Sequence, residues 1–305
     1  MSTTTRWKYM RLILQSSYLT LEYLLWRKYN LSFEKDTPTE FVKVLIVNKY
    51  HRNLNARVYI GDKLKIHLKQ YGSLGVGSYI ENEYLVIDYL RNQKFTDIPN
   101  ICFFDNDNLI LATCHLGDNT IAYQHINNLK VDTTWGEITS FLSKVIVKIK
   151  ELHKIKIPDY EPKLRMLSPT QIRAIDYTIQ APQYFADLAY LYKKWTPTSL
   201  IHFDLNLQNI LVVNKDIKII DWELAMIGDP VWDVALFIVA LCKKLGDDNF
   251  FTNKEPARFD QVKKVIQTLL ENYDVNRTKL KTYLRLITCQ YVDTNRKTIN
   301  RLIGK

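Results

Sequence analysis

Three oxygen-bearing side chains, those of Asp204, Asn209 and Asp221, flank two short apolar runs. The runs, 210–213 and 217–220, are separated by Asn-Lys-Asp, which is typical of a tight β-hairpin turn. Residues equidistant from such a turn face each other across the hairpin. We therefore expect Asn209 and Asp221 to meet at the open end, where Asp204, five residues before Asn209, also reaches.

Hard oxygen ligands of this kind suit Mg²⁺, which takes one or two carboxylates and fills its remaining positions with phosphate and water. In this interpretation Asn209 and Asp221 bind the metal, and Asp204 orients and deprotonates a hydroxyl nucleophile. The alternative is a polar loop that merely closes a hairpin, because Asp and Asn are common turn formers. The complete H-x-D-x-x-x-x-N…D spacing, which begins at His202, favours the catalytic interpretation over the structural one.

The same stretch resembles the aminoglycoside phosphotransferase and choline kinase family, most clearly from Leu200 to Leu236 and more faintly from Asn55 to Thr113. The residues that carry the resemblance are His202-Phe203-Asp204-Leu205, Asn209, Asp221-Trp222-Glu223, Gly228-Asp229-Pro230 and Asp233. It implies a bilobal protein-kinase-like fold of the α+β class and phosphorylation of a small-molecule hydroxyl by ATP and Mg²⁺. By the same match Asp204 is the catalytic base, and Asn209 and Asp221 are the magnesium ligands.

The resemblance also assigns supporting residues. Asp233 would hold the catalytic loop by hydrogen bonds, although it could also be the N-cap of the apolar helix expected over 234–241. His202 is interpreted as a packed, structural residue beside that loop. Phe203 departs from the family, which usually has glycine between the histidine and the aspartate.

A second candidate pair, Lys69 and Glu83, lies earlier in the chain. Lys69 is on the polar face of a predicted strand over 64–69, and Glu83 interrupts the apolar stripe of a helix that begins at Ser78. In kinase-like folds such a strand lysine binds the α- and β-phosphates and pairs with a helix glutamate. A solvated surface lysine is the alternative. The resemblance further implies a hinge that binds adenine through the backbone of Thr113, Cys114, His115 and Leu116.

The elements that must position these residues divide the 305-residue chain in three. We expect an N-terminal helical extension over 1–40, a strand-rich nucleotide-binding lobe over 41–116, and a helical catalytic and substrate-binding lobe over 117–305. A small strand-rich half followed by a larger helical half predicts two lobes with a cleft between them. The longest apolar run, 234–242, is too short to cross a bilayer, so we expect no membrane span and a cytoplasmic protein.

Composition and charge limit the classes of partner and substrate that we expect for this protein. The net charge is +10, but the basic residues are scattered, so nucleic acid is not an expected partner. Residues 254–305 carry 12 basic and 5 acidic residues, which disfavours polycationic aminoglycosides as acceptors. Glu161, Glu223 and Asp229 could still form a local acidic patch. Two other functions stay open: a pseudokinase that binds nucleotide without transfer, and an interaction protein that binds anions.

The four cysteines show no C-x-x-C spacing. Cys102 and Cys114 could face each other across a hairpin, but we expect buried free thiols, because free cysteine is among the most buried residue types.

Overall fold

A computed structural model describes residues 42–48, 53–60, 63–71, 78–106, 110–117, 119–130, 135–157, 164, 182–253, 255–256, 258–288 and 296–304. The chain divides into two compact units, with the boundary between residues 118 and 119. The helical extension predicted over 1–40 lies outside the described residues.

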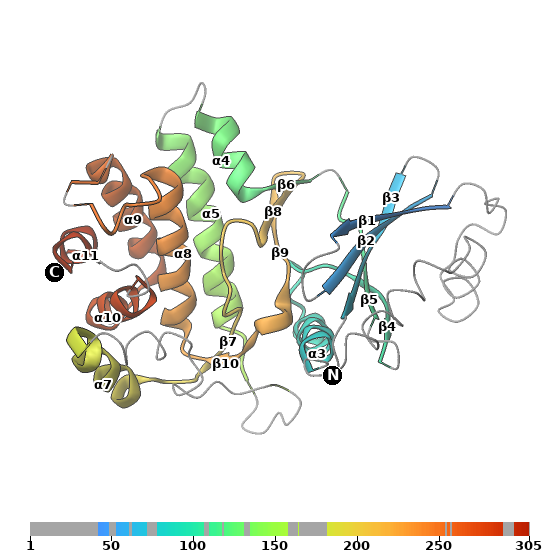
Figure 1. Cartoon of the computed structure of the whole chain (residues 1–305), viewed down its shortest axis with the longest axis horizontal. Coiled ribbons are helices and arrows are strands. Elements are labelled where there is room, and N and C mark those ends of the chain that lie inside the picture. The colour runs from blue at the N-terminus through green and yellow to red at the C-terminus, as the bar shows by residue number, and fades with distance from the viewer. Residues whose placement is uncertain are drawn as a thin grey trace. The chain divides into compact units, whose positions relative to one another are not determined.

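The first unit is one antiparallel sheet with a helix (Figure 1). Its five strands lie in the order β1-β2-β3-β5-β4. The elements are β1 (Val42–Asn48), β2 (Asn53–Ile60), β3 (Lys63–Tyr71), α3 (Ser78–Asn92), β4 (Ile101–Asp105) and β5 (Ile110–Cys114). The predicted strand over 64–69 and the predicted start of α3 at Ser78 are confirmed.

Alternation along β3 separates the two faces of this sheet. Ile66 and Leu68 are buried in a core cluster with Ala56, Val58, Phe103 and Ala112. His67 and Lys69 are half-buried and lie on the opposite face, because successive side chains of a strand point to opposite sides. The polar face predicted for Lys69 is therefore confirmed.

Cys102 and Cys114 join β4 to the end of β5 as a disulfide, so the expectation of two free thiols is wrong. The pairing register shifts between Ile101 and Phe103, and this irregularity places Cys102 within reach of Cys114. Cys242, in the second unit, is a buried free thiol as expected.

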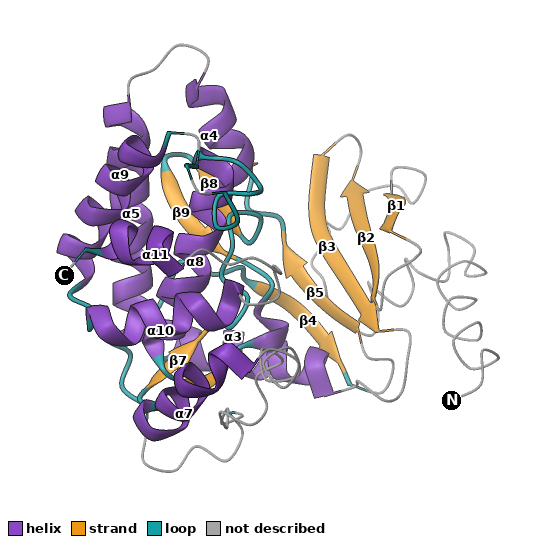
Figure 2. Ribbon diagram, turned by 60° about the vertical axis from the view of Figure 1, so that its left-hand side comes forward, coloured by secondary structure: helices purple, strands orange, loops and turns teal. Residues whose placement is uncertain are grey.

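The second unit is mainly helical and contains two small antiparallel sheets (Figure 2). One has the strand order β6-β8-β9, and the other pairs β7 with β10. The strands are β6 (Asn119–Ile121), β7 (Ser199–Ile201), β8 (Ile210–Val213), β9 (Asp216–Ile219) and β10 (Met226–Gly228). The helices are α4 (Ala122–Lys130), α5 (Trp135–His153), α7 (Phe185–Lys194), α8 (Pro230–Leu245), α9 (Phe259–Tyr273), α10 (Arg277–Thr288) and α11 (Arg296–Ile303), with short 3₁₀ turns at Pro182–Tyr184 and Trp222–Leu224.

Helix α8 supplies much of the core of this unit. It is buried along nearly its whole length and packs against α10, while α5 packs against α9. The buried residues of α5 form one apolar stripe with a 3.6-residue period. Among the described helices, none is long and apolar enough to cross a membrane.

Candidate active site

The β8–β9 hairpin is the scaffold of the candidate site. Its turn has two residues, Asn214 and Lys215, with φ values of 50° and 72°, as a type I′ turn requires. Val213 pairs with Asp216 and Ile210 with Ile219. The predicted hairpin is confirmed, but the predicted three-residue turn is wrong by one residue.

That difference shifts the register at the open end. Asn209 lies opposite Ile220, whose N–H donates to the Asn209 carbonyl oxygen over 2.9 Å. Asp221 is therefore one residue beyond the position expected for it, and its backbone takes a left-handed conformation with φ of 67°. Its side chain is half-buried.

The Asp204 carboxylate is held by two amides. Nδ2 of Asn209 donates to Oδ2 of Asp204 over 3.1 Å, and Nδ2 of Asn206 donates to Oδ1 over 3.2 Å. Partial burial raises the pKa of Asp204, and the negative charge of Asp221 raises it further, against opposing effects of His202 and the two amides. Asp204 and Asp221 are thus close enough to influence each other electrostatically. Asn209 and Asp204 meet as predicted.

The oxygen atoms at the open end of the β8–β9 hairpin are suitable ligands for a magnesium ion. Because Nδ2 of Asn209 faces Asp204, the side-chain carbonyl oxygen of Asn209 is the atom left for a cation. The Asp221 carboxylate is the second hard oxygen donor, and a cation would relieve its repulsion of Asp204.

His202 joins the loop that carries Asp204 to the end of β9. It is fully buried, and its Nε2 lies 2.9 Å from the carbonyl oxygen of Ile220. A carbonyl only accepts, so Nε2 carries the proton and Nδ1 accepts from the Asp204 N–H over 3.4 Å. The histidine therefore links the backbone of Asp204 to the residue before Asp221, which fits its predicted structural role.

Asp233 binds the backbone just before Asp204. Its Oδ2 accepts from the His202 N–H over 2.7 Å, and its Oδ1 accepts from the Phe203 N–H over 2.9 Å. The alternative in which Asp233 is a helix N-cap is wrong: α8 begins before it, and Asp229 is its N-cap, accepting from the Val231 N–H over 3.1 Å. The sequence prediction missed this start because the apolar run begins only at Val234.

Phe203 occupies a left-handed position with φ of 66°. Glycine adopts this conformation freely, whereas a residue with a Cβ is strained there by about 1 kcal/mol. The Phe203 ring is half-buried and stacks on Trp232, with centroids 6.1 Å apart and planes inclined by 19°. The glycine that is usual at this position in the resembled family would adopt the left-handed backbone without strain. In this chain the Phe203 ring makes an aromatic contact with Trp232 instead.

Asp229 belongs to a buried network that sequence reasoning did not find. Its Oδ2 accepts from the Thr196 N–H over 3.0 Å and from the Tyr283 hydroxyl over 2.9 Å, and it forms an ion pair with Lys279. Asp229 is fully buried. It therefore does not line an acidic acceptor patch, as the sequence had allowed. Glu161, named for the same patch, lies outside the described residues.

In the first unit, Nζ of Lys69 lies 2.8 Å from Oε2 of Glu83. The Glu83 side chain is 6% exposed and the Lys69 side chain 19% exposed. The expected pair is thus formed, and the alternative of a solvated surface lysine is wrong.

The predicted hinge comprises the last two residues of β5 and the two residues that follow them. Nε2 of His67 lies 3.1 Å from Nδ1 of His115, so the segment after Cys114 is tied to β3. Burial lowers the pKa of His67 to about 4, and the nearby His115 and Arg57 lower it as well. Thr113, Cys114, His115 and Leu116 are all half-buried.

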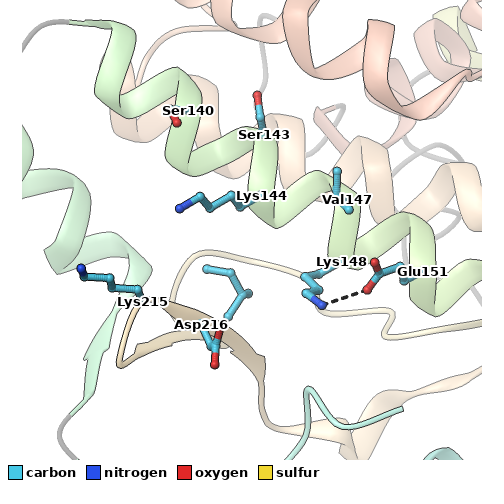
Figure 3. Close-up of a pocket in the computed structure, with 9 residues that line it drawn as sticks. Ser140, Ser143, Lys144, Val147, Lys148, Glu151, Lys215 and Asp216 are labelled. Carbon is cyan, nitrogen blue, oxygen red and sulfur yellow. Dashed lines mark hydrogen bonds and ion pairs between the residues drawn. The ribbon is translucent and has the colours of Figure 1, made fainter. Parts of the chain in front are cut away.

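A groove of about 610 Å³ marks the other end of the β8–β9 hairpin (Figure 3). It lies between α5 and the turn, and its lining includes Lys144, Lys148 and Lys215. Lys148 is paired with Glu151 over 3.0 Å. None of the predicted site residues lines this groove, so the hairpin separates the groove from the cluster around Asp204.

Comparisons with known proteins find a matching family and similar folds. Residues 141–264 match the phosphotransferase enzyme family, a range that contains Asp204, Asn209, Asp221 and Asp233. The predicted resemblance is confirmed. No curated protein sequence matches the chain.

Kinase-like phosphotransferases are also found among the similar solved structures. A choline kinase from Cryptosporidium parvum Iowa II has a TM-score of 0.59 at 15% identity, covering 93% of this chain and 92% of that one. The aminoglycoside phosphotransferase APH(3'')-Id from Streptomyces rimosus has a TM-score of 0.57 at 16% identity, covering 89% and 97%. The choline kinase LicA from Streptococcus pneumoniae has a TM-score of 0.55 at 14% identity, covering 92% and 96%, and its complex with AMP is similar too. The predicted kinase-like α+β fold is confirmed.

Proposed function

We propose that this protein transfers the γ-phosphoryl group of ATP to a hydroxyl of a small molecule. One observation carries the proposal: Asp204 and Asn209 are in hydrogen-bond contact at the open end of the β8–β9 hairpin, with Asp221 close enough to affect the Asp204 charge. The family match over 141–264 and the kinase-like fold support a phosphotransferase of the small-molecule kinase type.

Asp204 is the proposed general base. It would accept the proton of the acceptor hydroxyl as that oxygen bonds to the γ-phosphorus and the bond to the β–γ bridging oxygen breaks, releasing ADP. Asn206 and Asn209 hold the carboxylate in one orientation, and its raised pKa makes it a stronger base than an ordinary aspartate.

Nucleotide binding is assigned to both units. Asn209 and Asp221 would hold Mg²⁺, which neutralises phosphate charge when bound. Lys69, oriented by Glu83, would contact the α- and β-phosphates. The backbone of Thr113, Cys114, His115 and Leu116 would bind the adenine.

The acceptor is proposed to be a small alcohol. Choline kinases and aminoglycoside phosphotransferases are both among the similar structures. The short interval between Asp221 and Asp233 leaves little room for a peptide-docking segment. Because Asp229 is fully buried and bound to Lys279, any cation-binding acidic patch has to be built without it.

The test is a transfer assay with γ-labelled ATP against a panel of amino alcohols, aminoglycosides and sugars. We expect Asp204→Asn to lower turnover by about 10³-fold while MgATP still binds, since a positioned base contributes on the order of 10²–10⁴-fold. EDTA should abolish turnover, and Mg²⁺ should restore it. Asp216→Asn, an exposed carboxylate of the same hairpin, is the matched control and should be neutral.

Two outcomes would contradict the proposal. Full turnover by Asp204→Asn would remove Asp204 from the chemistry. MgATP binding by the wild type without transfer to any acceptor, and without hydrolysis, would favour a pseudokinase.

A further inference from the structure

A chain of hydrogen bonds runs from the end of α9 to the catalytic loop. Nδ1 of His153, the last residue of α5, is hydrogen-bonded to the hydroxyl of Tyr273, the last residue of α9. Nε2 of the same ring lies 3.1 Å from Oδ2 of Asp233. The His153 side chain is 4% exposed and that of Asp233 is fully buried, so water does not substitute for these contacts.

The chemistry of the partners decides where the protons lie. Burial raises the pKa of Tyr273 well above its ordinary value, and the charges of Asp233 and Asp229 raise it further, so the hydroxyl keeps its proton. The Asp233 carboxylate only accepts, so Nε2 of His153 carries the proton and donates to it, and Nδ1 of the neutral ring accepts from the Tyr273 hydroxyl. The Asp233 carboxylate thus receives three N–H groups: those of His153, His202 and Phe203.

The opposite tautomer of His153 would break this arrangement. With the proton on Nδ1, the lone pair of Nε2 would face the carboxylate of Asp233, and the two would repel each other. Asp233 would then turn away from His153, and its bonds to the backbone N–H groups of His202 and Phe203 would weaken. Those N–H groups immediately precede Asp204.

We propose that Tyr273 is a positioning residue for the reaction: its hydroxyl binds Nδ1 of His153 and holds the ring in the orientation in which Nε2–H meets Asp233, which in turn orients the backbone that carries Asp204. This inference rests on the proposed function for its catalytic consequence, but the positioning itself is measurable without turnover. The Tyr273 hydroxyl does not touch Asp204 and takes no part in the transfer.

The experiment is a double-mutant cycle of Tyr273→Phe and His153→Gln. The side-chain amide that His153→Gln introduces offers Asp233 an N–H whether or not the tyrosine hydroxyl is present. We expect Tyr273→Phe alone to lower kcat by about tenfold, with KM for ATP changed less than about twofold, as is typical of residues that orient a site from behind it. In the His153→Gln background the same change should alter kcat less than about twofold, because the two residues act as one unit.

A control variant separates positioning from loss of stability. Thr288→Val removes a buried hydroxyl that donates to the Leu284 carbonyl oxygen over 2.6 Å, elsewhere in the helical unit. It should lower the free energy of unfolding without changing kcat. If Tyr273→Phe lowers kcat equally in both His153 backgrounds, the hydroxyl acts by packing and the inference is overturned.

Selective ¹⁵N-histidine labelling gives a readout independent of catalysis. We expect the ring nitrogens of His153 to show the Nε2–H tautomer, and the backbone amide signal of His202 to shift in Tyr273→Phe but not when this change is added to His153→Gln. If these signals behave so and no transfer occurs, the proposed function fails while the positioning holds. If transfer occurs and the signals do not move, the positioning fails and the proposed function stands.

Discussion

The two groups of candidate site residues are held in very different ways. In the helical unit, Asp204 stands on a loop whose backbone and side chains are bonded to Asn206, Asn209, His202 and Asp233, two of which are fully buried. In the sheet unit, Lys69 is positioned by the strand β3 and by its ion pair with Glu83 from α3. The loop needs the network because it lacks regular backbone pairing of its own, whereas a strand side chain inherits its direction from the sheet.

This contrast teaches where a mutation should cause unfolding and where it should affect binding alone. Removing an anchor of the loop leaves buried N–H groups without acceptors, which is costly. Removing a partner on the sheet leaves the strand itself intact.

The largest effect is expected from Asp233→Ala. It deprives the N–H groups of His153, His202 and Phe203 of their acceptor, and we expect the free energy of unfolding to fall by about 3–5 kcal/mol. Urea unfolding followed by circular dichroism measures it. Glu83→Ala is the comparison in the sheet unit and should cost about 1 kcal/mol, because Lys69 can reach water. Equal losses of unfolding free energy in the two variants would contradict the proposed difference between the loop and the sheet.

The next effect separates binding from stability within the sheet unit. Lys69→Met should weaken MgATP binding by about tenfold or more. It should also destabilise the fold by about 2 kcal/mol, since it leaves the buried Glu83 carboxylate without this cation. In the double variant Lys69→Met/Glu83→Gln stability should recover while affinity stays low, as measured by calorimetric titration and thermal unfolding. If the double variant recovers both its stability and its affinity for MgATP, Lys69 does not contact the nucleotide.

A pH effect is expected from His67. Its folded-state pKa of about 4 lies below the ordinary 6.5, so the unfolded state binds more protons between these values and stability falls as pH decreases through that window. The loss should be on the order of 2 kcal/mol after allowance for partial exposure. His67→Asn should flatten the stability curve between pH 6.5 and 4. If the pH dependence of stability is the same in His67→Asn as in the wild type, groups other than His67 cause the loss of stability.

The smallest effect concerns the backbone of Phe203. Phe203→Gly and Phe203→Ala both remove the contact with Trp232, but only alanine must bear the left-handed φ of 66°. We expect the glycine variant to be more stable than the alanine variant by about 1 kcal/mol, the reverse of the usual order. The usual order would indicate that the loop relaxes, and that it is less firmly anchored than the contrast implies.

Much of the arrangement could be predicted because local patterns determine it. The β8–β9 hairpin follows from two apolar runs and a turn, and the Lys69–Glu83 pair follows from a polar strand face and a carboxylate in an apolar helix stripe. The errors are also local: counting Asp216 as a turn residue moved Asp221 by one position, and the apolar run from Val234 hid the helix start at Asp229.

What could not be predicted depends on contacts between distant parts of the chain. His153 meets Tyr273 and Asp233 because α5, α8 and α9 pack together, and Asp229 meets Tyr283 because α8 packs on α10. The periodicity of the sequence does not predict such hydrogen-bond partners, because every buried tyrosine fits the same apolar pattern. The disulfide was missed for a similar reason: a register shift in β4, which the sequence does not mark, brings Cys102 to Cys114.

The spacing of Asp229 and Asp233 restricts how this part of the chain can change in length. Four residues are about one helical turn, so Asp229, which caps α8, and Asp233, which binds the backbone before Asp204, lie on the same side of the helix. Inserting a single residue between them would rotate Asp233 by about 100° relative to Asp229. Natural insertions and deletions that diversify such proteins should therefore fall before Asp229 or beyond the first turn of α8, but not inside this interval.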